Sequence, residues 1–169
     1  ESALSRLADL YAIRGEGERG AEVCFRLAEL AVRREDWPRA TAQAEWALSL
    51  HRSLEGLQAA GQIFLLASHP ERAAPSFAEA AAIASQKHED QTAAALFKRA
   101  CELAPADREV LQSAAQFLVD RGDQSVDELY INALSNLLEH GEVDESRLIL
   151  EEGLRYSSDT ITMRRRAAQ

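Results

Sequence analysis

The feature that most constrains this chain is the spacing of its helix breakers and caps, because each stretch between them is one short helix long. The spacing predicts about ten helices joined by connections of about two to five residues. They are expected at 2–14, 20–34, 37–52, 54–67, 71–86, 89–103, 107–121, 125–139, 142–156 and from 159 onward. Links this short force consecutive helices to run antiparallel.

The composition favours the same fold class. Among 169 residues there are 31 Ala and 22 Leu but only six Val and six Ile. Strong helix formers dominate, and the β-branched residues that favour strands are scarce. The chain is therefore predicted to be all-α.

One stretch, 54–87, shows how two of these helices would pack. Its apolar and small residues recur at helical spacing on both sides of the turn Ser68-His69-Pro70, so each helix has one face for its neighbour. They are Leu57, Ala60, Gly61 and Phe64, then Ala73, Phe77 and Ala80. Large residues beside small ones would let the helices approach closely, with Phe64 and Phe77 filling the gap beside Gly61, Ala73 and Ala80.

These seven positions make the stretch resemble the tetratricopeptide repeat (TPR) family. Weaker versions recur elsewhere, as in the series Leu27, Ala28, Ala40, Ala44, Ala47 and the series Tyr130, Ala133, Leu134, Leu137, Gly141. The resemblance covers nearly the whole chain and implies a right-handed superhelical solenoid of antiparallel helix hairpins.

The expected organisation is a single array over 1–169. It comprises a half-unit at 1–20, hairpins at about 21–53, 54–87, 88–121 and 125–158, and a partial end helix at 159–169. The signatures at 89–105 and 107–123, however, look like a second helix followed by a first. Either one hairpin has drifted from consensus, or the alternation shifts near 85–90.

The resemblance also implies a concave groove lined by the first helix of each hairpin. Carried over by repeat position, the groove residues are Glu22, Phe25, Glu29, Arg33, Gln58, Gln62, Leu65, Leu66, Asn132, Ser135, Asn136 and Glu139. Such a mixture of amides, charges and aliphatic side chains suits an extended or helical peptide. The pair Leu65-Leu66 either faces the groove as a contact or packs on the neighbouring hairpin.

No residue is predicted to be catalytic, to bind a cofactor or to hold a metal. The histidines fall at helix ends or turns without a neighbouring ligand, and no nucleophile or phosphate-binding motif occurs. Cys24 and Cys101 lie far apart on predicted helix faces, where a lone cysteine behaves as a small apolar residue. Arg121-Gly122-Asp123, a cell-adhesion tripeptide, is interpreted as a turn.

The charge excludes some partners. The formal net charge is -9, and between 120 and 152 ten acidic residues stand against Arg121 and Arg147. A chain with this balance is not expected to bind nucleic acid, and no apolar run is long enough for membrane insertion. Arg164-Arg165-Arg166 is either a docking tail or the polar face of an end helix.

The predicted function is a non-catalytic protein–protein interaction scaffold that binds a protein or peptide segment in its groove. The alternative is a structural or oligomerisation segment of a larger multidomain bacterial protein or of a secretion- or pilus-type machine, with self-association through the open ends. The groove lacks the Lys and Asn clamp by which some TPR domains hold carboxyl termini, since Phe25, Glu29 and Gln58 stand there. The chain looks like a fragment of a longer protein, and its expected location is the cytoplasm. Its 17 Arg against two Lys suggest a bacterial source.

Overall fold

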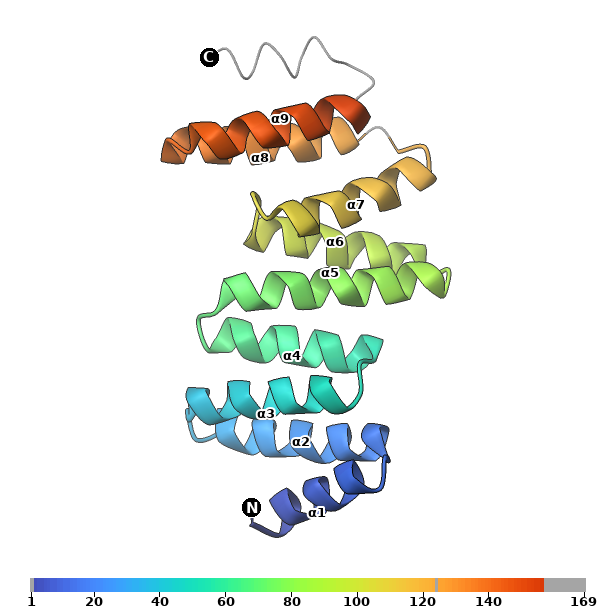
Figure 1. Ribbon diagram of the computed structural model, residues 1–169, viewed down its shortest axis with the longest axis vertical. Helices are drawn as coiled ribbons and strands as arrows, with labels where there is room; N and C mark the ends of the chain where they lie inside the picture. Colours follow the sequence, from blue (N-terminus) through green and yellow to red (C-terminus); the bar gives the residue numbers. More distant parts are fainter. Residues whose placement is uncertain (1, 124, 157–169) are drawn as a thin grey trace.

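The computed structural model describes residues 2–123 and 125–156. Over these residues it consists of nine α-helices and contains no strand. They are α1 (Ser2–Ile13), α2 (Gly17–Val32), α3 (Trp37–Leu50), α4 (Leu54–Leu66), α5 (Pro70–Gln86), α6 (Asp90–Leu103), α7 (Arg108–Asp120), α8 (Val126–His140) and α9 (Val143–Tyr156). The helices lie across the long axis in chain order, with α1 and α9 at opposite ends (Figure 1). The all-α fold class, a solenoid of antiparallel helical hairpins, is confirmed; the end helix at 159–169, including Arg164–Arg166, lies outside the described residues.

The observed helix ends lie within three residues of the expected ones. The largest difference is at α2, which begins at Gly17 and not at 20 because the turn before it is shorter than expected. A Cβ atom on Gly17 would lie 2.4 Å from the carbonyl oxygen of Leu50, so only glycine allows this close approach to the end of α3.

Six of the eight links close in the same way. Each contains one residue in the left-handed conformation: Gly15, Glu35, Ser68, His88, Gly122 or Gly141. The next residue then donates its N–H to the carbonyl five residues earlier, as in the bonds from Asp36 to Ala31 and from Glu89 to Ala84. This bond satisfies a carbonyl at the end of the helix and reverses the chain tightly.

The other two links, 51–53 and 104–107, have no left-handed residue and begin on His51 and Ala104 with φ values of -155° and -139°. Ser53 and Asp107 end these links as N-caps, accepting bonds from the backbone of the following helix. The two open links group the described helices in threes, which we name unit I (α1–α3), unit II (α4–α6) and unit III (α7–α9). The left-handed residues recur 53 or 54 positions apart in these units.

The division into hairpins at 21–53, 54–87, 88–121 and 125–158 therefore stays a prediction. The turn geometry favours the alternative that the alternation shifts near 85–90, because α5 joins α6 by a tight turn and packs extensively on it. The link between α6 and α7 inside the expected hairpin 88–121 is one of the open ones.

Residues related by the same shift of 53 or 54 positions are called equivalent below. Equivalent residues share their environment although their size differs. Buried sets are Ala8, Gly61 and Ala115 on the first helix; Cys24, Phe77 and Tyr130 on the second; Ala40, Ala93 and Ser146 on the third. The first helix of units II and III packs on the second and third helices of the preceding unit.

The close contact between α4 and α5 depends on a glycine. A Cβ atom built on Gly61 would lie 2.8 Å from the ring of Phe77, so α4 and α5 approach with the aromatic ring lying over bare backbone. In unit III the equivalent pair is Ala115 and Tyr130, and both side chains are larger. Accordingly, α7 and α8 make much less extensive contact than α4 and α5 do.

We predict that Gly61→Ala lowers the free energy of unfolding by about 1–3 kcal/mol, because the added methyl group overpacks the contact with Phe77. Phe77→Ala should cost about 3–5 kcal/mol through the cavity it leaves. In the double variant Gly61→Ala/Phe77→Ala the two losses should be clearly less than additive, since the clash disappears with the ring. Urea denaturation measures all three, and additive losses would contradict the contact.

Candidate functional site: two grooves between helices

Several of the groove residues predicted from the sequence in the range 22–66 meet between α2 and α4. A groove of about 310 Å³ lies there. Five of the predicted residues line it: Phe25, Glu29, Arg33, Gln62 and Leu66. The other lining residues are Val32, Ala59 and Ile63. We call this the α2–α4 groove. Residues about 30 positions apart in sequence thus form one surface.

The α2–α4 groove has an apolar floor with polar groups at its edge. Phe25 is half-buried and lies against Gly56, where a Cβ would be 3.2 Å from the ring. Gln62 accepts a 2.9 Å hydrogen bond from the guanidinium of Arg99, which fixes its amide. One carboxylate, Glu29, and one guanidinium, Arg33, make the rim formally neutral.

The two leucines of the pair Leu65-Leu66 have different environments. Leu65 is half-buried and packs on the main hydrophobic core. Leu66 is 48% exposed and lines the groove.

The remaining predicted residues do not line this groove. Glu22 is exposed and pairs with Arg26 at 2.7 Å on the same helix, and Gln58 is half-buried. Ser135 donates to the carbonyl oxygen of Ile131, as serine often does inside a helix. Asn136, whose backbone carbonyl is bonded to His140, and exposed Glu139 line neither groove.

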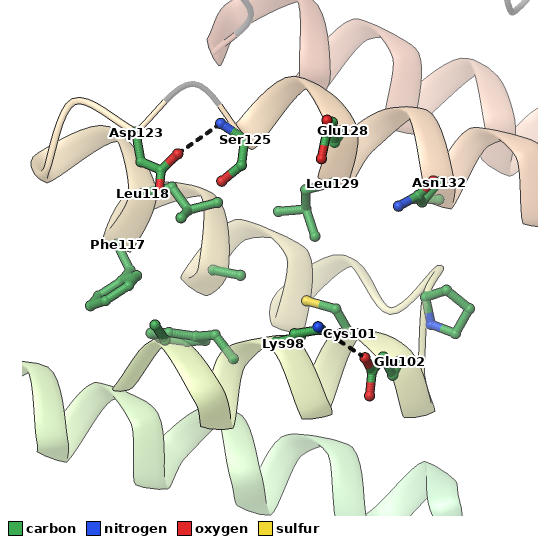
Figure 2. A pocket seen from close by; sticks show the side chains of 15 residues that line it. Lys98, Cys101, Glu102, Phe117, Leu118, Asp123, Ser125, Glu128, Leu129 and Asn132 are labelled. Carbon is green, nitrogen blue, oxygen red and sulfur yellow. Dashed lines mark hydrogen bonds and ion pairs between the residues drawn. The ribbon is translucent and has the colours of Figure 1, made fainter. Parts of the chain in front are cut away.

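Asn132 lines a second, larger cavity of about 600 Å³. We call it the α6–α8 groove, because α6 and α8 form its two sides and α7 its floor. Lys98, Cys101 and Glu102 lie on one side, and Glu128, Leu129 and Asn132 face them from the other (Figure 2). Of its lining residues only Asn132 was predicted, because no groove residues were carried over onto the expected hairpin 88–121, which contains α6 and α7.

The floor of the α6–α8 groove is apolar and its rim is acidic. Phe97 and Phe117 both line it and pack with tilted rings, whose centroids are 5.1 Å apart. The charged lining residues are Lys98, Glu102, Asp123 and Glu128. The hydrogen bond from the backbone N–H of Ser125 holds the pKa of the Asp123 carboxyl below its usual value, so this rim position is charged at neutral pH.

The tripeptide Arg121-Gly122-Asp123 is a turn, as interpreted from the sequence. Gly122 has φ of 66°, and Asp123 accepts a bond from the N–H of Ser125. Arg121 forms an ion pair with Asp90. Within the described ranges no three His, Cys, Asp or Glu side chains gather as metal ligands would, and no helix there has the length and apolar character to cross a membrane.

Comparisons with known proteins give the following. No protein-family model matches the chain, and no curated protein matches it. Among solved structures, the chain is similar to the MamA protein, with 16% identity, 87% of this chain and 89% of that chain covered, and a TM-score of 0.33. It is also similar to YrrB, "a TPR protein with an unusual peptide-binding site", with 16% identity, 88% of this chain and 92% of that chain covered, and a TM-score of 0.33. A third similar structure is a tetratricopeptide repeat protein from Parabacteroides merdae, with 11% identity, 99% of this chain and 82% of that chain covered, and a TM-score of 0.31.

At these identities and TM-scores the similarities transfer no site or partner to this chain. The class that its own fold and grooves define is a helical-repeat protein with surface grooves between neighbouring helices.

The cysteine of the α6–α8 groove provides a test of its geometry. Burial raises the pKa of the half-buried Cys101 to about 11, and that of the buried Cys24 also to about 11. Both thiols are therefore protonated at neutral pH and should react slowly with iodoacetamide. The rate at Cys101 should rise about tenfold per pH unit between pH 7 and 10 as thiolate forms.

Cys24 is the internal control, because it is fully buried and should react only after the protein opens. Mass spectrometry of the two cysteine peptides over time measures both rates. Equal rates at the two thiols, or fast and pH-independent reaction of Cys101, would show that the groove is not built as described.

Proposed function

We propose that this protein is a non-catalytic interaction scaffold that binds a polypeptide segment in the α2–α4 groove. The observation that carries the proposal is the convergence of Phe25, Glu29, Arg33, Gln62 and Leu66, from two helices, on one groove. Side chains of this kind anchor a peptide by burying an apolar residue while amides and charges bond its backbone and polar groups.

The groove favours a segment with one apolar anchor and little net charge. Its floor offers Phe25, Val32 and Ile63, and its rim charges cancel. The exposed Leu66 adds apolar surface that binding would bury. The cytoplasmic location and the bacterial source stay predictions.

The test is a selection of binders from a random peptide library displayed on phage. We expect selected peptides to share an apolar anchor and to lose affinity at least tenfold for Leu66→Arg, because a charge then lies at the mouth of the groove. Val119→Arg is the matched control, since Val119 is an exposed residue, 41% accessible, on α7 outside both grooves. Peptides that bind Leu66→Arg as tightly as the native protein would refute the proposal.

A specific observation also favours the alternative function, an assembly segment that self-associates. α1 exposes Ala3, Leu7 and Leu10 on one face. The equivalent residues are Gly56, Ala60 and Ile63 on α4 and Val110, Ala114 and Phe117 on α7, and all six are buried. Those helices bury them against the second and third helices of the preceding unit.

We propose that unit III of a second copy covers this face of α1, because its α8 and α9 are equivalent to the helix pairs that cover α4 and α7. Such a head-to-tail contact is open-ended, so the assembly should grow with concentration. Light scattering should show this growth, and Leu10→Arg should abolish it while Val119→Arg does not. Leu10 is 54% exposed, so the charge itself is tolerated in the monomer. A monomer at all concentrations would exclude self-association.

A further inference from the structure

The two junctions between units offer a comparison inside one molecule. Where units I and II meet, two ion pairs join α3 and the link that follows it to α5. Arg52 donates two hydrogen bonds to Glu79, at 2.7 and 2.6 Å, and Arg72 pairs with Glu45. The Arg72 guanidinium also lies 4.3 Å above the ring of Phe64. Together these side chains form a clasp over the junction.

The clasp is missing where units II and III meet. The positions equivalent to its four residues hold side chains that cannot form the same ion pairs: Lys98 for Glu45, Ser125 for Arg72, Pro105 for Arg52 and Asn132 for Glu79. All four line the α6–α8 groove. Neither of the two bridges can form between α6 and α8, and the positions that close one junction surround the open cavity at the other.

Two residues in the core of unit III, Ala115 and Tyr130, also keep the helices around this cavity apart. Ala115 and Tyr130 replace Gly61 and Phe77, so α8 cannot approach α7 as closely as α5 approaches α4. The Tyr130 hydroxyl donates a 3.3 Å hydrogen bond to the buried Glu152, which also accepts a 2.8 Å bond from Arg108. These bonds tie α8 and α7 to α9, which keeps this spacing fixed.

From this comparison we infer that the α6–α8 groove is a second binding site, for a basic, amphipathic polypeptide segment. An apolar side chain of the segment enters between Cys101, Leu118 and Leu129, and its Lys or Arg side chains meet the rim carboxylates.

Charge complementarity selects this partner. Glu102, Asp123 and Glu128 outnumber Lys98 on the rim, and Lys98 is already 4.0 Å from Glu102. The surrounding stretch 120–152 carries the ten acidic residues noted above. An acidic segment or a nucleic acid would be repelled here, and a neutral segment would gain nothing from the excess of carboxylates. The site is distinct from the neutral α2–α4 groove.

The experiment uses a fluorescein-labelled twelve-residue peptide with leucines on one helical face and arginines beside them, and the same peptide with glutamate for arginine. We expect the basic peptide to bind, and NMR shifts to concentrate on α6, α7 and α8. The acidic peptide should not bind. Glu128→Gln should weaken binding about two- to fivefold, the range of one exposed charge contact.

The decisive variant rebuilds the clasp. This variant carries four substitutions, which are Lys98→Glu with Ser125→Arg and Pro105→Arg with Asn132→Glu. They place both ion pairs at the second junction and should lower the affinity for the basic peptide at least tenfold. The control for Lys98→Glu with Ser125→Arg is Lys87→Glu with Ser113→Arg. It makes the same charge change at exposed positions outside both grooves, and it should leave the affinity for the basic peptide unchanged. Native melting behaviour of each variant shows that it is folded.

Three results would overturn the inference: no NMR shifts at about 1 mM basic peptide, equal binding of the acidic peptide, or full binding by a folded clasp variant. Leu66→Arg separates this site from the α2–α4 groove, because it should leave binding of the basic peptide intact. Failure at one groove is therefore distinguishable from failure at the other.

Discussion

The structure depends on how closely the first and second helices of each unit can approach. The helices are short and bury mainly alanine, so contact requires one large residue against one small one. Gly61 under the Phe77 ring gives the most extensive contact among the three pairs of first and second helices, and its neighbours form the continuous core that joins α2 to α7. In unit III the same position holds Ala115, and its core is a separate cluster of residues from α7, α8 and α9.

Solenoids of this kind bind through the surfaces that their stacking leaves open. A junction can be closed by side chains from both units or left open for a partner, and this chain contains one junction of each kind. Both use the same backbone. Four substitutions at equivalent positions therefore distinguish a structural junction from a proposed binding junction without any change of fold.

Much of this could be predicted from the sequence. Helix positions followed from caps and breakers, and five of the α2–α4 groove residues followed from repeat register. The three-helix grouping was not predicted, because two-helix and three-helix arrays share the same i, i+3, i+4 pattern. Only the link conformations distinguish them, and Glu35, Ser68 and His88 adopt the left-handed conformation although they are not glycine. The α6–α8 groove was missed because its residues look ordinary until they are compared with the clasp.

The central claim, that the helices form units of three, is tested most directly by native-state hydrogen exchange read at single amides. Helices of one cooperative unit share an opening free energy. The account predicts that α4, α5 and α6 open together, and that α8 and α9 open together at a lower free energy than unit II. If α4 opened with α5 while α6 opened separately with α7, the cooperative units would be pairs of helices and the grouping in threes would be wrong.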